Sequence, residues 1–401
     1  MTAVDTETSR HLAIIGNQGF SLLNFRGPLI ADLVAQGHRV TALAPEITAE
    51  VAADLRALGA EPIETPLART GLNPLGDLVY LLHLRRALTR LRPDAVLAYA
   101  AKPAIYGTLA AWLAGVPRRI AMIEGLGYVF MAGPDDTLRR TILRGLVKAL
   151  YRFALARAHR VLFLNRDDIA DFASMRLVPQ EKAVLLGPIG VDLDTWRPAP
   201  PVTAPVTFTL VARLLRDKGV LEFIDAARIV RRRHSAVRFL LVGAPDANPQ
   251  SVTAEEVAAW VAEGIVEWPG HVPVQPWLAQ TSVFVLPSFY REGVPRSTQE
   301  AAAMARAIIT TDVPGCRDTV IDGANGILVP PRDAPALAAA MQRFIDDPAL
   351  IADMGRQSRH VAEQRFDVHE ANRRIISVLG GNDLELDDLR YGIRSSSGLT
   401  R

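Results

Sequence analysis

Two basic side chains stand at the end of an apolar run in the second half of the sequence. The run TFTLVA ends at Ala212, and Arg213 and Lys218 follow it before the next helical pattern begins. A strand-to-helix turn with two cations suits a diphosphate, because the side-chain charges and the free amides of the helix both attract its oxygens. Ordinary surface charge is the alternative for such a pair, and the position after a strand favours the anion site.

Two carboxylates mark a second candidate group, in the segment REGVPRSTQEAAA. Glu292 lies in a loop with Gly293 and Pro295 after a buried run, and a helix carrying Glu300 is expected to begin one or two residues after Pro295. Eight residues span about 12 Å along a helix, at 1.5 Å per residue. Carboxylate pairs that hydrolyse glycosides lie about 5–9.5 Å apart. Glu292 and Glu300 therefore suit the two ends of a longer ligand, a sugar and a ribose diol joined by a diphosphate. A solvated helix face is the alternative for Glu300.

A glycine-containing turn follows the first apolar run of the chain. Gly16, Asn17 and Gly19 stand between HLAII and the next helical pattern. The dinucleotide fingerprint G-x-G-x-x-G is absent, and the apolar run over 39–44 is not followed at once by the acidic residue that would bind an adenosine ribose. Both features argue against an NAD-dependent enzyme.

These residues must be positioned by the elements around them. Short apolar runs rich in β-branched residues alternate with longer amphipathic segments along the chain. The runs begin at His11, His38, Asp94, Arg119, His159, Val206, Val237, Ile265, Ser282 and Ala307. Such runs are typical of parallel sheets covered on both faces, so the sequence predicts a doubly wound α/β fold. Ligands of these sheets bind at the carboxyl ends of the strands, and with two such domains we expect the site in the cleft between them.

The length and composition predict two globular domains. The chain has 401 residues, of which 49% are apolar and 22% charged, and a single core rarely grows to that size. A segment with five prolines, residues 188–206, predicts a linker, because proline denies hydrogen bonds to a sheet. The expected parts are a first domain over 1–197, a second domain over 198–365, a C-terminal helix over 366–379 that returns to the first domain, and a mobile tail over 380–401.

The second half resembles glycosyltransferase family 4, whose retaining enzymes have the GT-B fold of two facing Rossmann-like domains. The family has a Glu–seven residues–Glu pattern, matched by Glu292 and Glu300, and an Arg-to-Lys-Gly motif, matched by Arg213, Lys218 and Gly219. The segments GVDLDTW, AIITTDVPGCRDTV and VIDGANGILVPPRDAPALAAAM match as well. The resemblance covers essentially the whole second domain.

The resemblance assigns roles to these residues. It implies that Arg213 and Lys218 bind the diphosphate of a UDP-sugar, that Glu292 contacts the transferred sugar and that Glu300 holds the ribose. It makes the second domain the nucleotide-sugar side and the first the acceptor side, and it implies neither a metal nor another cofactor. Further donor contacts are implied for Gly16, Glu124, His271, Val272, Gly293, Val294 and Pro295.

The first domain departs from the family at Glu124, where many members have a histidine that contacts the donor sugar. The sequence Glu-Gly-Leu-Gly from Glu124 resembles a narrower group that transfers N-acetylhexosamines to polyprenyl-diphosphate sugars. Its members tend to have His-Lys where this chain has Ala101-Lys102. The likeness implies acceptor contacts at Asn17 and Lys102.

A basic amphipathic segment is consistent with a lipid-linked acceptor. Residues 137–160 contain seven Lys or Arg and no acid, and the apolar positions have helical spacing. The cations with a period of four are Arg140, Arg144, Lys148 and Arg152. Such a helix can lie on an anionic membrane, where each cation adds about 1 kcal/mol. A core-packed helix with a basic exposed side is the alternative.

Other features limit the partners and the compartment. A single cysteine, Cys316, fits a reducing compartment, and the N-terminus lacks the pattern of a secretory signal. The histidines lack the spacing of metal ligands. The run Arg231–Arg233 at a predicted helix end indicates compensation of the helix dipole rather than nucleic-acid binding. We expect a cytoplasmic enzyme, peripheral on the cytoplasmic face of the inner membrane.

The sequence thus predicts a metal-independent, retaining transfer of an N-acetylhexosamine from a UDP-sugar to a polyprenyl-diphosphate-linked sugar in bacterial glycan assembly. Three alternatives stay open. They are transfer to a soluble or polysaccharide acceptor, a nucleotide-sugar epimerase, and a non-catalytic sugar- or lipid-binding subunit of the same fold.

Overall fold

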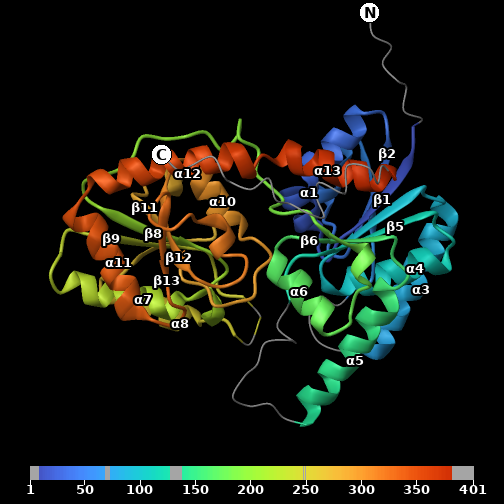
Figure 1. The fold of residues 1–401 in the computed structure, drawn as a ribbon, viewed down its shortest axis with the longest axis horizontal. Coiled ribbons are helices and arrows are strands. Elements are labelled where there is room, and N and C mark those ends of the chain that lie inside the picture. Colours follow the sequence, from blue (N-terminus) through green and yellow to red (C-terminus); the bar gives the residue numbers. More distant parts are fainter. Residues whose placement is uncertain (1–8, 68–72, 127–137, 247, 249, 382–401) are drawn as a thin grey trace, which may run out of the picture. The chain divides into compact units, whose positions relative to one another are not determined.

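The computed structural model describes residues 9–67, 73–126, 138–246, 248 and 250–381, without the side chains of residues 138–140. The chain divides into two compact units. The first ends at Ile189 and resumes at Val368, and the second is Gly190–Asp367 (Figure 1). The boundary expected at residue 197 lies inside the second unit, because Val191 is buried in that unit's core and its backbone N–H donates to Phe366. Most of the tail expected over 380–401 lies outside the described residues.

The first unit is built on a parallel sheet. Its described strands are β1 (His11–Ile15), β2 (Arg39–Ala44), β3 (Ala60–Glu64), β4 (Ala95–Tyr99), β5 (Arg118–Ile123), β6 (Arg160–Phe163) and β7 (Ala183–Leu185). They lie in the order β3-β2-β1-β4-β5-β6-β7. The order changes direction between β1 and β4, which are paired from Leu12 with Ala95 onward. This is the point at which doubly wound sheets bind ligands.

Helices cover both faces of this sheet (Figure 1). They are α1 (Gly19–Ala35), α2 (Ala49–Ala57), α3 (Pro74–Leu91), the π-helix η1 (Pro103–Gly107), α4 (Thr108–Leu113), α5 (Leu138–Leu155), α6 (Arg166–Ser174), the short 3-10 helix η3 (Gln180–Lys182) and α13 (Val368–Gly380). Helix α3 begins at Pro74, whose missing N–H costs nothing in a first turn, and the Asn73 side chain accepts from the Gly76 N–H at 3.0 Å.

Helix α13 packs against α1 and belongs to the first unit although it comes last in the described chain. Arg10 Nη1 donates to the Gly380 carbonyl at 2.7 Å, and Arg118 Nε donates to the Val378 carbonyl at 3.0 Å. Asn372 Nδ2 donates to Asp32 on α1 at 2.7 Å. These bonds fix both ends of the helix.

The second unit repeats the architecture with a smaller sheet. Its described strands are β8 (Thr207–Val211), β9 (Arg238–Val242), β10 (Glu267–Gly270), β11 (Val283–Leu286), β12 (Ala307–Thr311) and β13 (Gly326–Val329). Their order is β10-β9-β8-β11-β12-β13, and neighbouring strands are parallel. The switch point lies between the central strands β8 and β11.

The helices of the second unit enclose two buried apolar clusters, one on each face of the sheet. They are η4 (Arg216–Lys218, 3-10), α7 (Val220–Arg231), α8 (Ala254–Ala262), α9 (Gln275–Ala279), α10 (Arg296–Ala303), η5 (Arg317–Thr319, 3-10), α11 (Ala334–Asp346) and α12 (Ala349–Arg365). Among the helices of the described residues, none has the length and hydropathy that crossing a bilayer requires.

The ten predicted strands are all present, and the part of the chain that the structure describes contains three more. The added strands β3, β7 and β13 each lie at an edge of a sheet. An edge strand has one hydrogen-bonded neighbour and is less covered, so its sequence need not be a continuous apolar run. The β3 sequence AEPIE, with its exposed and half-buried positions, shows this directly.

Candidate functional site

The two charged motifs of the second unit meet at its switch point. The loop with Arg213 and Lys218 follows β8, and the loop with Glu292 follows β11, the strand paired with β8. The carboxyl ends of adjacent parallel strands share one edge of the sheet, so residues far apart in sequence become neighbours there.

Lys218 and Glu292 are in direct contact. The Lys218 ammonium forms an ion pair with Glu292 Oε1, and Ser288 Oγ donates to the same oxygen at 3.1 Å. The side chains of Lys218 and Glu292 are only 14% and 12% exposed. The ammonium also lies 5.4 Å from the centroid of the Tyr290 ring. The pair is therefore largely shielded from water, where its charges interact more strongly than at the surface.

The backbone around this pair is closely packed. The Asp217 carbonyl accepts from the N–H groups of Phe289 and Tyr290, both at 3.0 Å, which joins the two loops. Gly219 has φ of 78°, and a Cβ built there would lie 2.1 Å from the Pro287 carbonyl oxygen. Glycine is required here on both counts, because other residues disfavour this φ and the backbone oxygen leaves no space.

Glu300 is held by a different partner. Helix α10 begins at Arg296, one residue after Pro295 as expected, and no side chain caps its first turn. Arg296 Nε donates to Glu300 Oε1 at 2.9 Å, and Glu300 is 8% exposed. Burial raises the pKa of the Glu300 carboxyl, and Arg296 opposes this shift. Gly293, Val294 and Pro295 are buried beside this helix start, where N–H groups without intrahelical partners can bind phosphate oxygens.

Three other predicted donor residues, Arg213, His271 and Val272, have different surroundings. Arg213 is 56% exposed and pairs with Asp246, Nη1 to Oδ2, at 3.2 Å. His271 is exposed and Val272 packs on the core, both after β10, which is an edge strand separated from β8 by β9. The structure does not bring His271 to the Lys218–Glu292 pair.

In the first unit, Gly16 and Asn17 follow β1 and are linked to β4 through Tyr99. A Cβ built at Gly16 would lie 2.5 Å from the Tyr99 hydroxyl, so this turn also needs a glycine. The Tyr99 hydroxyl shares a 2.8 Å hydrogen bond with Ser21 Oγ, which lies 3.3 Å from Asn17 Oδ1. Burial raises the pKa of Tyr99, so its hydroxyl stays neutral at physiological pH.

Glu124, after β5, has a partner that the sequence did not reveal. Arg26 on α1 is 1% exposed, forms an ion pair with Glu124 Oε1, and places its guanidinium 4.4 Å from the Tyr99 ring centroid. A buried guanidinium needs a counter-charge, and the Glu124 carboxylate lies in contact with it. The sequence signal that could have revealed this buried pair is the single arginine, Arg26, within an apolar helical segment.

Lys102, just before η1, belongs to a second cluster of the first unit. Its Nζ donates to Asp77 Oδ1 at 2.8 Å, and the Tyr106 hydroxyl donates to Asp77 Oδ2 at 3.1 Å. Asp77 is buried in the first turn of α3. It stands among leucines in the sequence, and that isolated acid was a signal for a buried partner.

The basic helix α5 differs from the expected pattern. Arg144 and Lys148 are half-buried, and Arg152 donates to the carbonyls of Met175 and Arg176 at the end of α6, at 3.2 and 2.9 Å. The side chain of Arg140 lies outside the described residues. Large apolar side chains of α5, among them Ile142, are exposed as well.

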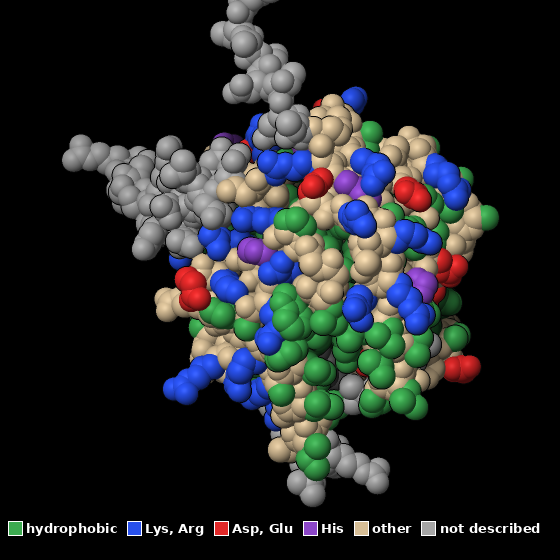
Figure 2. Space-filling model, turned by 90° about the vertical axis from the view of Figure 1, so that its right-hand side faces the viewer, with side chains coloured by type: hydrophobic (Ala, Val, Ile, Leu, Met, Phe, Trp, Pro, Cys, Tyr) green, Lys and Arg blue, Asp and Glu red, His purple; other side chains and the backbone are tan. Residues whose placement is uncertain are grey.

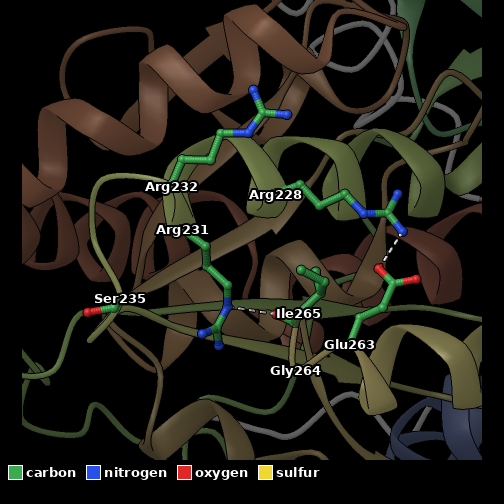
Figure 3. A pocket seen from close by; sticks show the side chains of 7 residues that line it. All are labelled: Arg228, Arg231, Arg232, Ser235, Glu263, Gly264 and Ile265. Atoms are coloured by element: carbon green, nitrogen blue, oxygen red, sulfur yellow. Dashed lines mark hydrogen bonds and ion pairs between the residues drawn. The ribbon is translucent and has the colours of Figure 1, made fainter.

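A shallow pocket of about 640 Å³ lies at the opposite edge of the second sheet, at the ends of α7 and α8 (Figure 3). Arg228 points toward Glu263 and pairs with it at 2.8 Å, whereas Arg231 Nε donates to the Ile265 carbonyl at 3.2 Å. Arg232 extends away from Glu263. These arginines satisfy the ends of neighbouring elements, and none of the predicted site residues lines the pocket.

The remaining questions for the described residues are metal ligation and thiol chemistry. Within the described ranges, no three His, Cys, Asp or Glu residues are arranged to hold a metal ion. Cys316 is fully buried, and burial raises its pKa to about 12, which keeps the thiol unreactive.

Two family models and several known proteins match this chain. The "Glycosyl transferase 4-like domain" model matches residues 27–188, and the "Glycosyl transferases group 1" model matches residues 205–347. A relative from Campylobacter jejuni, N,N'-diacetylbacillosaminyl-diphospho-undecaprenol alpha-1,3-N-acetylgalactosaminyltransferase, is 27% identical over 88% of this chain and 94% of its own length.

Solved structures match across both units. Sucrose-phosphate synthase from Thermosynechococcus elongatus has a TM-score of 0.75 at 19% identity, covering 94% of this chain and 100% of that one. Anabaena HepE in complex with UDP has a TM-score of 0.69 at 17% identity, covering 93% and 100%. At these identities the likeness concerns the fold. The two family models together span most of the chain, which therefore belongs to glycosyltransferase family 4 and has the GT-B fold.

Proposed function

We propose that this glycosyltransferase moves an N-acetylhexosamine from a UDP-sugar to a polyprenyl-diphosphate-linked sugar, with retention of configuration, during bacterial glycan assembly. The observation that carries the donor side is the contact of Lys218 with Glu292 at the switch point of the second sheet. An ammonium has three N–H donors, so Lys218 can hold Glu292 and a phosphate oxygen together.

The second unit would bind the diphosphate, the ribose and the transferred sugar of the donor through different residues. Lys218, Arg213 and the first amides of α10 would hold the diphosphate, because all three present positive charge or N–H groups at the carboxyl edge. Glu300 would accept hydrogen bonds from the ribose diol, and its ion pair with Arg296 would orient the buried carboxylate. Glu292 would accept from hydroxyls of the transferred sugar.

The reaction needs no separate base in this scheme. The acceptor hydroxyl attacks the anomeric carbon on the face from which UDP leaves, so a glycosidic C–O bond forms as the bond to the phosphate breaks. The hydroxyl proton passes to the leaving phosphate oxygen. Lys218, Arg213 and the α10 dipole stabilise the negative charge that grows on UDP, which is the electrostatic work that fixed charges do well. We propose that these charges suffice without a metal.

The first unit would receive the acceptor. Lys102 is positioned by Asp77 at the end of β4, next to β1 and its Asn17 turn at the switch point, where a diphosphate group of the acceptor would find a cation. The Campylobacter relative is named for an acceptor of the diphospho-undecaprenol class, and its match covers both units. We further propose that the protein is cytoplasmic and peripheral on the inner membrane, with the basic helix α5 near the lipid headgroups.

Acceptor-dependent release of UDP tests this proposal. UDP-N-acetylhexosamines are incubated with a short-chain prenyl-diphosphate sugar or with soluble glycans, and the anomeric proton coupling of the product is read by NMR. Release of UDP with the prenyl-diphosphate sugar and a product that retains the donor configuration is expected. If UDP were released only with soluble glycans, the lipid-linked acceptor assignment would be wrong. A product with inverted anomeric configuration would refute the retaining mechanism.

A further inference from the structure

Helix α3 carries apolar side chains on both of its faces over its first turns. One face lies in the core of the first unit and contributes Tyr80, Leu84, Ala87 and Leu88. The other face exposes Leu75 by 76%, Leu78 by 49%, Val79 by 55% and Leu82 by 40%. These four positions, the α3 stripe, have the i, i+3, i+4, i+7 spacing of one helical side. An exposed stripe of this kind marks an interaction site.

The neighbouring helix α5 extends this apolar surface. Ile142 and Leu146 are 64% and 50% exposed, one turn apart. Helices α3 and α5 both pack against η1 and α4, and Figure 2 shows hydrophobic side chains gathered in the lower part of this face, with Lys and Arg next to them. At the other end of α5, the Arg157 guanidinium lies 3.4 Å from the ring centroid of Phe153, which is 48% exposed.

The charge around the α3 stripe is one-sided. Across the whole chain, 45 Lys and Arg nearly balance 43 Asp and Glu. Helices α3, α4 and α5 together contain eight Lys or Arg and one acid, Asp77. Asp77 is neutralised by its ion pair with Lys102. Arg85 and Arg86 follow the stripe on α3 and are exposed. This surface therefore combines exposed leucines with an excess of positive charge.

We infer that the α3 stripe is a membrane-contacting surface that enters the boundary between headgroups and acyl chains of an anionic bilayer. Its leucines and valine leave water for the acyl region, while Arg85 and Arg86 bind lipid phosphates. A nucleic acid would satisfy the cations and leave the leucines in water, so the combination favours lipid.

The same helix connects this surface to the acceptor side of the site. Asp77 lies between Leu75 and Leu78 and pairs with Lys102 at the carboxyl end of β4. A diphosphate bound at Lys102 would have its polyprenyl chain within one helical turn of the stripe. This connection rests on the proposed lipid-linked acceptor, whereas the bilayer contact rests on the exposed side chains and their charge.

Flotation of the full chain with vesicles tests the inference. Vesicles of phosphatidylcholine, with or without phosphatidylglycerol, are mixed with the wild type and with Leu75→Gln/Val79→Gln. The matched control is Ile229→Gln/Val261→Gln, two exposed apolar residues of helices in the second unit. We expect wild type and control to float with the anionic vesicles. The α3 variant should bind them at least about ten-fold more weakly, because two apolar side chains that gain free energy by leaving water have been replaced by polar ones.

The outcomes separate this inference from the proposed function. Binding of the α3 variant equal to that of the control, or no flotation of the wild type, would overturn it. So would a wild-type dimer that the α3 substitutions dissociate, since the stripe would then bind a second copy. Thermal melting checks that both variants are folded. Transfer to a water-soluble short-chain acceptor without vesicles tests the reaction alone, so its failure would refute the acceptor assignment and leave the flotation result to stand on its own.

Discussion

Replacement of Lys218 by methionine tests two roles of this lysine, its ion pair with Glu292 and its proposed contact with the donor diphosphate. The substitution keeps the length of the side chain and removes the charge that pairs with Glu292. Because both side chains are at most 14% exposed, the free energy of unfolding should fall by about 3 kcal/mol, the lower end of the range for breaking a buried pair. If Lys218 also binds the donor diphosphate, kcat/KM should fall about 10²–10³-fold, or 2.7–4 kcal/mol.

A double-mutant cycle with Glu292→Gln distinguishes these effects. Glu292→Gln alone leaves the Lys218 charge unpaired, whereas the double variant with Lys218→Met lacks both charges of the pair. The double variant should therefore recover in urea unfolding most of the stability that either single substitution loses. The cost of Lys218→Met to UDP affinity should remain, because UDP contains the diphosphate and lacks the sugar that Glu292 contacts. Calorimetric titration of UDP measures this. If Lys218→Met had no effect on UDP binding in the Glu292→Gln background, Lys218 would only position Glu292, and the diphosphate assignment would be wrong.

Three further predictions follow from the contacts. Gly219→Ala should lower the free energy of unfolding by about 1–3 kcal/mol and weaken UDP binding, because its positive φ disfavours alanine and the Pro287 oxygen leaves no space for a Cβ. The control is Gly145→Ala in α5, where nothing lies within 4 Å of the added Cβ. It should be neutral or stabilising in the same thermal melts. Asp77→Asn should raise KM for the acceptor several-fold with KM for the UDP-sugar unchanged; equal changes in both would contradict the acceptor role. Burial, and to a lesser extent neighbouring arginines, lowers the pKa of His159 from 6.5 to about 4. Between pH 6.5 and about pH 4 the histidine therefore takes up a proton in the unfolded chain but not in the folded one. The free energy of unfolding should fall as the pH drops through this range. His159→Asn should flatten that part of the melting profile, and an unchanged slope would assign it to other groups.

The sequence predicted the sheets and the positions of the two charged motifs of the second unit at strand ends, because both depend on local patterns. Continuous apolar runs identify strands buried on both faces, and Lys218 and Glu292 could be placed because strand ends of one sheet share an edge. The pairs Arg26–Glu124 and Lys102–Asp77 could not be predicted, because their members are separated by 98 and 25 residues and meet only through tertiary packing.

Helix α5 shows a second limit of the sequence. The period of four in its cations predicted an exposed basic face, and the structure instead half-buries Arg144 and Lys148 and binds Arg152 to the end of α6. Periodicity gives the faces of a helix but not which face meets solvent when long basic side chains can lie along neighbouring elements. The exposed stripe of α3 was hidden for the same reason, since leucines at helical spacing usually indicate a core face.

Transfer of labelled sugar into lipid tests the central claim most directly. A panel of UDP-hexoses and UDP-N-acetylhexosamines is offered with a polyprenyl-diphosphate sugar, and label in the organic phase is counted for the wild type, for Glu300→Ala and for the control Ile229→Gln. The account predicts label from a UDP-N-acetylhexosamine with the wild type and the control, and its loss with Glu300→Ala. Label that reaches only soluble glycans, or that persists in Glu300→Ala, would contradict it.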